Sequence, residues 1–371
     1  MEKNTVISAV SSQELDCLRR LSGLFGPTGC EDRVLAFLGE ELEKLGAEAA
    51  FDRMGNLICR MRFGGAGEEP LPRLMISAHT DEVGFMITEI TEEGYLRFGN
   101  LGGIDTAVLP GKRVTVLSDA GLLRGVIASK AIHHKDKKER EKGVKAEKLY
   151  IDIGAGSREV AETMVSVGDF ATFASEFFLM GEGERVCAKG KALDDRMGCC
   201  AMLEVICRLT ECPPPVAAEV FFCFTVREEI GLSGARVAAN ELAPDYALIL
   251  ETTAIGDIAD APDARRVATF GGGGVISVMD RSTVYDRRFV DFALSLAERE
   301  KIPAQVKRYV SGGNDAGSIH KTGEGVRCLA LSVPTRYLHS PACVARLSDY
   351  AAVRDLCEAI VRNPDALFRE D

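Results

Sequence analysis

The chain has 371 residues, of which 46% are apolar and 27% charged, and its formal net charge is −11. This composition is that of a globular protein with one large domain or two ordinary ones. The negative charge argues against nucleic acid or an anionic membrane as the main partner.

The N-terminus and the cysteines bear on location. Residues 1–16 lack the apolar core and cleavage site of a signal peptide, and no run approaches about 18 apolar residues. The twelve cysteines form no C-x-x-C pair, which favours reduced, buried thiols over a disulfide framework. We therefore expect a cytoplasmic location and no membrane span.

The N-terminal segment predicts two helices. Ser11 precedes Glu14 by the spacing of a capping box, and leucines follow at helical intervals, so we predict a helix over 11–24. Gly26 and Pro27 interrupt it. A second helix is predicted over 31–45, and alternating segments predict strands near 57–62 and 73–78.

The stretch 83–178 differs in composition and pattern from the segments before it. It is rich in glycine and in short β-like runs separated by turn residues, among them VGFMITEI, KRVTVLS, LLRGVIAS and DFATFAS. This pattern predicts a small all-β barrel or sandwich. The charged run HHKDKKEREKG (133–143) indicates a solvated loop or short helix rather than a binding element.

After residue 180, helices and strands alternate. A helix is predicted after Asp195, then a strand VFFCFTV, a short helix over 233–242 (SGARVAANEL) and a strand YALILE. Further on come a strand GVISVM, a helix DRRFVDFALSLAERE, strands AQVKRYV and VRCLALSV, and a final helix over 348–361. Strands separated by helices indicate parallel βαβ units. The predicted fold class is therefore α/β: an α/β/α sandwich with a mixed, largely parallel sheet, built from residues 1–82 and 179–371 and interrupted by an all-β domain at 83–178.

Five polar segments stand at or just past these predicted strands and helices. Carboxylates and imidazoles at strand ends suit a metal site, because ligands of an open α/β sheet bind beyond the carboxyl ends of its strands. Histidines and acids without cysteine suit Zn²⁺, Co²⁺ or Mn²⁺. The segments are SAHTDEVG (His79, Asp81), KALDDRMG (Asp194, Asp195), FTVREEIGLSGA (Glu228, Glu229), LILETT (Glu251) and VPTRYLHSP (His339).

The spacing within the first two segments suggests separate roles for neighbouring residues. On an extended segment His79 and Asp81 project to the same side, so His79 can bind metal while Asp81 accepts its other ring N–H. The alternative is a surface histidine beside an unrelated acid. Asp194 is favoured as a carboxylate that bridges two cations, and Asp195 or its neighbour can cap the following helix.

The remaining acidic pair and the other histidines are treated differently. Glu228 and Glu229 follow an apolar strand, and because adjacent side chains diverge, one can bind metal while the other takes a proton from water. We expect His133, His134 and His320 to lie outside the main site. A contribution of His133 or His134 from a partner subunit stays open.

Seven motifs together carry a resemblance to a known family. They are HTDEVGF, ALDDRMG, EEIGLSGA, GGNDA and PTRYLHS, with LYIDIGAGS and VGDFATF in the insert. On these motifs the sequence resembles the M42 metallo-aminopeptidases, which include the TET peptidases and members labelled glutamyl aminopeptidase or endoglucanase. The resemblance covers nearly the whole chain.

The resemblance implies two divalent metal ions per subunit, zinc or cobalt, and short peptide substrates. It implies that Asp194 bridges the ions, that Glu228 is the general base and that Asp81 orients His79. His79 and Glu251 would complete one metal site, and Glu229 and His339 the other, a pairing that the sequence leaves open. It further implies a PDZ-like insert that assists dimerisation and a homo-oligomer built from dimers, often a dodecamer.

Three alternatives remain at this stage. Many family members have Asp in place of Glu251, and this choice separates aminopeptidases from related carboxypeptidases and deacylases; Asn314, where Thr is common, leaves the side-chain preference open. Glycoside hydrolysis by two carboxylates would need neither His79 nor His339, and the chain has no Trp for stacking sugars. A metal-binding assembly protein without catalysis would not need Glu228.

Overall fold

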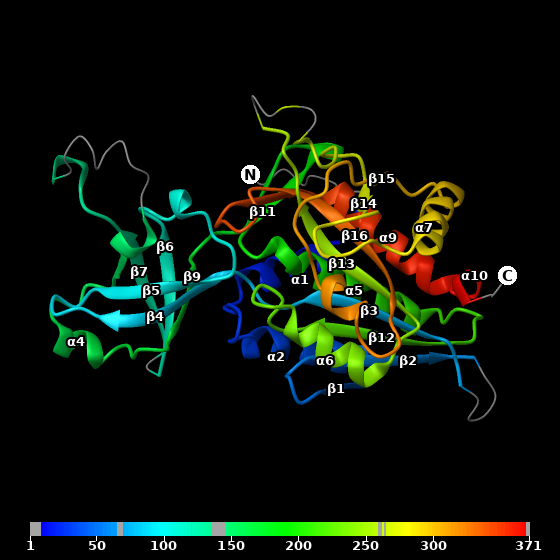
Figure 1. The fold of residues 1–371 in the computed structure, drawn as a ribbon, viewed down its shortest axis with the longest axis horizontal. Coiled ribbons are helices and arrows are strands. Elements are labelled where there is room, and N and C mark those ends of the chain that lie inside the picture. The colour runs from blue at the N-terminus through cyan, green and yellow to red at the C-terminus, as the bar shows by residue number, and fades with distance from the viewer. Residues whose placement is uncertain are drawn as a thin grey trace.

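The computed structural model describes residues 9–64, 70–119, 121–134, 145–258, 262 and 265–368. These residues form a large α/β domain and, to one side of it, a separate closed β-barrel (Figure 1). Most of the charged run 133–143 lies outside the described residues. His133 and His134 belong to a short 3-10 helix, Ile132–His134.

One mixed sheet organises the α/β domain. Its main path runs β1-β2-β12-β3-β13-β16-β17-β11-β10, with β14 and β15 attached beside β16. The strands are β1 (Ala49–Phe51), β2 (Leu57–Phe63), β3 (Arg73–His79), β10 (Phe178–Met180), β11 (Cys187–Gly190), β12 (Ala218–Thr225), β13 (Tyr246–Ala254), β14 (Gly274–Ile276), β15 (Ala304–Val306), β16 (Arg327–Arg336) and β17 (Cys343–Arg346).

Parallel pairing dominates only the centre of this sheet. The neighbours β12, β3, β13 and β16 are parallel, as the alternation of strands and helices predicts. Both flanks are antiparallel, from β2 to β1 and from β17 to β10. The expectation of a largely parallel sheet is therefore correct for these four strands and for the pair β14–β15, but not for the flanks, whose short strands join without crossover helices.

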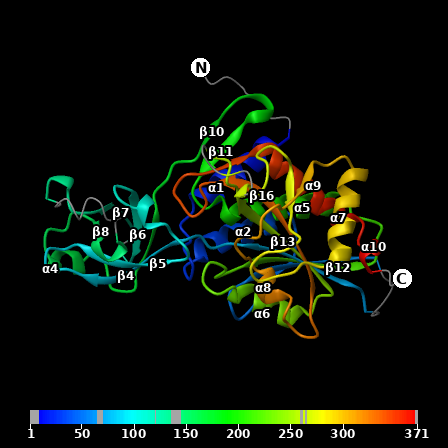
Figure 2. The ribbon, with the colours of Figure 1, turned by 45° about the horizontal axis from the view of Figure 1, so that its top comes forward.

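Helices cover both faces of the sheet. α6 and α8 pack on one face, and α1, α2, α5 and α9 on the other (Figure 2). The helices of this domain are α1 (Ser12–Gly23), α2 (Asp32–Lys44), α5 (Leu193–Glu211), α6 (Ser233–Leu242), α7 (Arg287–Arg299), α8 (Ala316–Ile319), α9 (Leu347–Arg362) and α10 (Asp365–Phe368), whereas α4 (Arg158–Glu162) belongs to the barrel. The capping box of α1 is confirmed, since Ser11 accepts from the Glu14 N–H and Glu14 from the Ser11 N–H.

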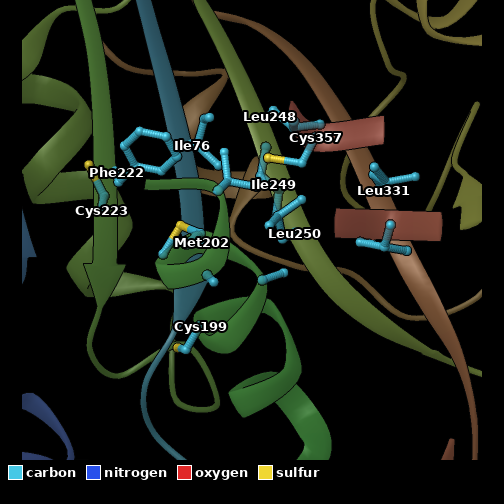
Figure 3. Close-up of a cluster of buried hydrophobic side chains, with 14 of the residues drawn as sticks. Ile76, Cys199, Met202, Phe222, Cys223, Leu248, Ile249, Leu250, Leu331 and Cys357 are labelled. Carbon is cyan, nitrogen blue, oxygen red and sulfur yellow. The ribbon is translucent and has the colours of Figure 1, made fainter. Parts of the chain in front are cut away.

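The core between the sheet and α5 holds the central strands in place. Phe222 of β12, Ile76 of β3 and Leu248 of β13 are fully buried, and Met202 of α5 packs beneath them (Figure 3). Cys199, Cys223 and Cys357 lie in this core too, as small apolar side chains. All twelve cysteines are free, as expected. This packing fixes the strand ends on which the polar segments stand.

The insert is a closed barrel of six strands in the order β4-β5-β8-β7-β6-β9. The strands are β4 (Gly84–Ile90), β5 (Leu96–Leu101), β6 (Arg113–Ser118), β7 (Gly121–Ala128), β8 (Tyr150–Asp152) and β9 (Phe170–Phe173). The predicted β-barrel is thus confirmed, with its own core around Phe85 and Phe173. The expectation that the insert is all-β is wrong, because the short helix α4 packs on the barrel. A PDZ-like shape and the limits 83–178 stay predictions.

Glu82 lies where the chain first crosses from the α/β domain into the barrel. Its carboxylate accepts from the Lys191 ammonium at 2.5 Å and from Thr172 Oγ1 at 2.8 Å. Its N–H donates to Gly26 O, and its carbonyl accepts from Thr28 N, both at 3.0 Å. Because Thr172 belongs to β9, the last strand of the barrel before the chain returns, Glu82 ties the barrel to the α/β domain.

Over the part of the chain that the structure describes, no helix has the length and apolar character to cross a bilayer.

Candidate metal centre

The four parallel central strands bring the predicted residues to one edge of the sheet. His79 is the last residue of β3, Glu228 and Glu229 follow the end of β12, and His339 follows β16. Glu251 lies within β13, which continues to Ala254, whereas the sequence suggested that it ends the strand. The carboxyl ends of parallel strands share an edge, so residues far apart in the chain meet there.

Asp194 lies between the two histidines. Its Oδ1 is 3.3 Å from His79 Nε2, and its Oδ2 is 3.4 Å from His339 Nε2. The backbone at Asp194 and Asp195 departs from helical geometry at the start of α5. Asp195 instead accepts from the Gly198 N–H at 3.1 Å, so the capping role falls to Asp195 and leaves Asp194 free to face both rings.

Two groups of possible ligands share Asp194. The first contains His79, Asp194 and Glu251, and the second Asp194, Glu229 and His339, with one ligand atom of each residue within 4.8 Å of the others. We call them the sheet subsite and the loop subsite. A third group, which joins His79 to Glu228 and Glu229, overlaps both. The grouping matches the pairing that the family resemblance implies.

Asp81 contacts residues of both subsites. Its Oδ1 accepts from the Glu228 N–H at 3.0 Å, and its Oδ2 from the Glu229 N–H at 3.1 Å and from Thr28 Oγ1 at 2.7 Å. The His79 Nδ1 lies 3.1 Å from the Asp81 carbonyl oxygen and 3.4 Å from its carboxylate. Asp81 therefore fixes the backbone turn at Glu228 and Glu229, and it also orients the His79 ring.

The pKa values of the cluster show an excess of buried negative charge. Burial raises the pKa of Glu251 to about 8 and that of Glu229 to about 7, and the charge of Asp194 adds to both shifts. Burial lowers the pKa of His339, but Asp194 and Glu229 outweigh it and raise the value to about 9.

This charge, together with the donor set, fits divalent cations. The imidazoles and carboxylates of the cluster compete for protons, because each imidazole faces two or more acids. Neutral imidazole nitrogen and carboxylate oxygen, without thiolate, are donors that suit Zn²⁺ and Co²⁺. The residues present therefore fit two cations, one in each subsite.

Three nearby residues escaped the sequence interpretation. Thr28 bonds to Asp81, and the Gly103 carbonyl, in the barrel, lies 2.7 Å from His339 Nδ1. Asp315 is buried behind His79, accepts from Thr225 Oγ1 at 2.9 Å, and keeps Oδ1 without a partner. Burial raises its pKa to about 6. Thr28 and Asp315 lie in the motifs GPTGCE and GGNDA; nothing in the sequence marks a backbone carbonyl.

The other described histidines lie outside these groups. His320 ends α8, where its Nδ1 is 2.6 Å from the Ala316 carbonyl oxygen. His133 and His134 belong to the barrel.

Comparison with known proteins places this chain among the aminopeptidases. Residues 55–356 match the family described as M42 glutamyl aminopeptidase. A putative aminopeptidase of Acetivibrio thermocellus is 37% identical over 347 residues, which cover 93% of this chain and 98% of that protein.

Solved structures of TET peptidases have the same fold. The TET aminopeptidase of the marine sediment archaeon Thaumarchaeota archaeon SCGC AB-539-E09 has a TM-score of 0.89 at 34% identity, covering 95% of this chain and 96% of that one. The Pyrococcus horikoshii TET1 peptidase, which can assemble into a tetrahedron or a large octahedral shell, has a TM-score of 0.81 at 32% identity, covering 94% and 99%. The chain belongs to the M42 family of aminopeptidases, which hydrolyse peptide bonds.

Proposed function

We propose that the protein is a dinuclear metal-dependent aminopeptidase that removes N-terminal residues from short peptides. The observation that carries the proposal is Asp194, whose two oxygens face His79 and His339 in two ligand groups that share no other residue. This carboxylate would help to hold a cation in each group. His79 and Glu251 complete the sheet subsite, and Glu229 and His339 the loop subsite.

Glu228 is the proposed general base. Burial raises its pKa well above the ordinary value of a glutamate, against the opposing charge of His79. Asp81 holds its backbone N–H, which fixes the side chain beside the site. When bound, the two cations would acidify water and stabilise negative charge on the substrate carbonyl oxygen. Glu228 takes the proton from the attacking water and delivers it to the leaving amine.

A panel of substrates tests the reaction. The protein reconstituted with Zn²⁺ or Co²⁺ is offered aminoacyl-arylamides and N-blocked peptides. We expect turnover of substrates with a free α-amino group and loss of that turnover after exhaustive chelation. Turnover of blocked substrates alone would support a carboxypeptidase or deacylase, and hydrolysis of a glucan that survives EDTA would support a glycoside hydrolase.

We also propose that the protein forms a homo-oligomer. Support comes from the assemblies of the Pyrococcus horikoshii relative and from apolar side chains exposed on the α/β domain, such as Val284, which is 76% exposed, and Met279, which is 44% exposed. Light scattering after size exclusion measures the subunit number. A monomer at micromolar concentration would contradict this part of the proposal.

A further inference from the structure

The loop that follows β5 reaches from the barrel to the metal centre. The Gly103 carbonyl oxygen of this loop lies 2.7 Å from Nδ1 of His339. The preceding residue, Gly102, leaves little room beside the second ligand of the loop subsite, because a Cβ added there would lie 3.1 Å from Glu229 Oε2. The barrel thus touches the two residues that, with Asp194, make up the loop subsite.

His339 needs such an external support more than His79 does. Its side chain is 33% exposed, against 2% for His79. Its φ of 54° puts its backbone in the left-handed region, in a loop beyond the end of β16. His79, in contrast, ends a buried central strand. Packing and the contact with Asp81 therefore both hold the His79 ring, whereas the more exposed His339 ring depends more on its bond to Gly103.

The bond to Gly103 selects one tautomer of His339. A carbonyl oxygen only accepts, so Nδ1 must carry the hydrogen and donate it. The lone pair is then on Nε2, which lies 3.4 Å from both Asp194 Oδ2 and Glu229 Oε1. That nitrogen is the one that faces the proposed cation, and a fixed ring orientation and tautomer raise its affinity for metal.

We propose that the inserted barrel, through the Gly103 carbonyl, is the positioning element of the loop subsite, so that the docking of this domain decides whether the second cation binds. The inference rests on the proposed dinuclear function. Gly103 acts through His339 and touches no substrate. The crossing at Glu82, which is bonded to Lys191 and Thr172, holds the barrel where this contact forms.

The experiment compares two substitutions of barrel glycines with positive φ. Gly102, with φ of 84°, has Val83 Cγ1 and Glu229 at 2.7 and 3.1 Å from the place of a new Cβ, so Gly102→Ala shifts the loop. Gly111, with φ of 79°, has nothing within 4 Å, so Gly111→Ala adds the same backbone cost without displacement. Calorimetric titration of the metal-free proteins with Co²⁺ gives the number and affinity of the sites.

We expect two cations for the wild type and for Gly111→Ala. For Gly102→Ala we expect the affinity of one site to fall by about 10- to 100-fold and the other to stay unchanged. If the wild type binds two cations and Gly102→Ala binds both as tightly, the inference fails while the proposed function stands. If the wild type binds only one, the dinuclear centre fails and this inference with it.

Two further measurements guard against a Gly102→Ala variant that does not fold. Asp105→Ala removes an exposed side chain whose carboxylate accepts from Ala107 N at 2.9 Å and thereby shapes the same loop. The control is Asp152→Ala, at the end of β8, which removes a comparable hydrogen bond from Gly154 N. We expect only Asp105→Ala to weaken one cation site. Nitrogen NMR of the metal-free wild type above about pH 9, where the His339 ring is neutral, should show its single proton on Nδ1, and a neutral ring with that proton on Nε2 would overturn the inference.

Discussion

The two subsites share Asp194 but differ in what holds them. In the sheet subsite, His79 and Glu251 stand on β3 and β13, strands whose residues are almost all buried in the core. In the loop subsite, Glu229 and His339 lie on segments that follow β12 and β16, and the His339 ring is bonded to the Gly103 carbonyl of the barrel. One half of the centre is therefore built by the α/β domain alone, and the other by two domains in contact.

This difference shows how an insertion can enter an active site without contributing a catalytic side chain. The barrel has its own apolar core, yet its Gly103 carbonyl reaches the His339 ring. A change in how the barrel is docked would alter the loop subsite first, since among the described residues no hydrogen bond joins His79 or Glu251 to the barrel. The following predictions test the division.

The largest effect on activity is expected for the proposed base Glu228, which acts together with both subsites. Glu228→Gln removes the proposed base but keeps the size of the side chain and its backbone bond to Asp81. We expect kcat to fall by about 10²- to 10⁴-fold, with both cations retained. Steady-state kinetics and metal analysis of the same preparation measure this. Unchanged kcat would remove Glu228 from the mechanism.

Substitution of each histidine should empty one subsite. His79→Ala is expected to weaken the sheet subsite, and His339→Ala the loop subsite, each by more than about 100-fold, because loss of a residue that only orients a ligand already costs 10- to 100-fold. Titration with Co²⁺ counts the remaining sites. If either variant loses both cations equally, the two subsites are not separable as described.

Asp81→Asn should weaken both subsites. The amide replaces one acceptor oxygen with a donor, which faces N–H or O–H groups of Glu228, Glu229 or Thr28. We expect about 10- to 100-fold loss of affinity at each site. Asp349→Asn is the control, because Asp349 also accepts from backbone N–H groups, of Gly271 and Gly273, at another place in the fold. Equal losses in both variants would contradict a specific role for Asp81.

The smallest effect is expected for Thr28→Val, which keeps the shape of the side chain and removes one bond to the Asp81 carboxylate. A hydrogen bond to a charged, buried group contributes about 1.5–3 kcal/mol to stability. We expect a loss of that order in the free energy of unfolding, measured by urea denaturation, and less than tenfold loss of metal affinity. A larger effect on one subsite than on the other would show that Asp81 serves them unequally.

Much of the α/β domain follows from local patterns. The predicted helix over 233–242 is α6 without change, and the capping spacing of Ser11 and Glu14 marks the start of α1. Apolar runs located the four central strands because buried parallel strands are apolar throughout. The antiparallel flanks were not foreseen, since strands of three or four residues such as β10 and β17 carry too short a pattern.

The amino-acid sequence by itself determined which polar side chains stand at or near strand ends, and therefore the kind of centre they can form. Only the tertiary structure decided that Asp194 lies between His79 and His339, and that Gly103 supports one of them. The strands lie in the order β12-β3-β13-β16, which is not their order in the chain. Contacts across such a sheet depend on strand order and domain docking, which arise from packing of the whole molecule.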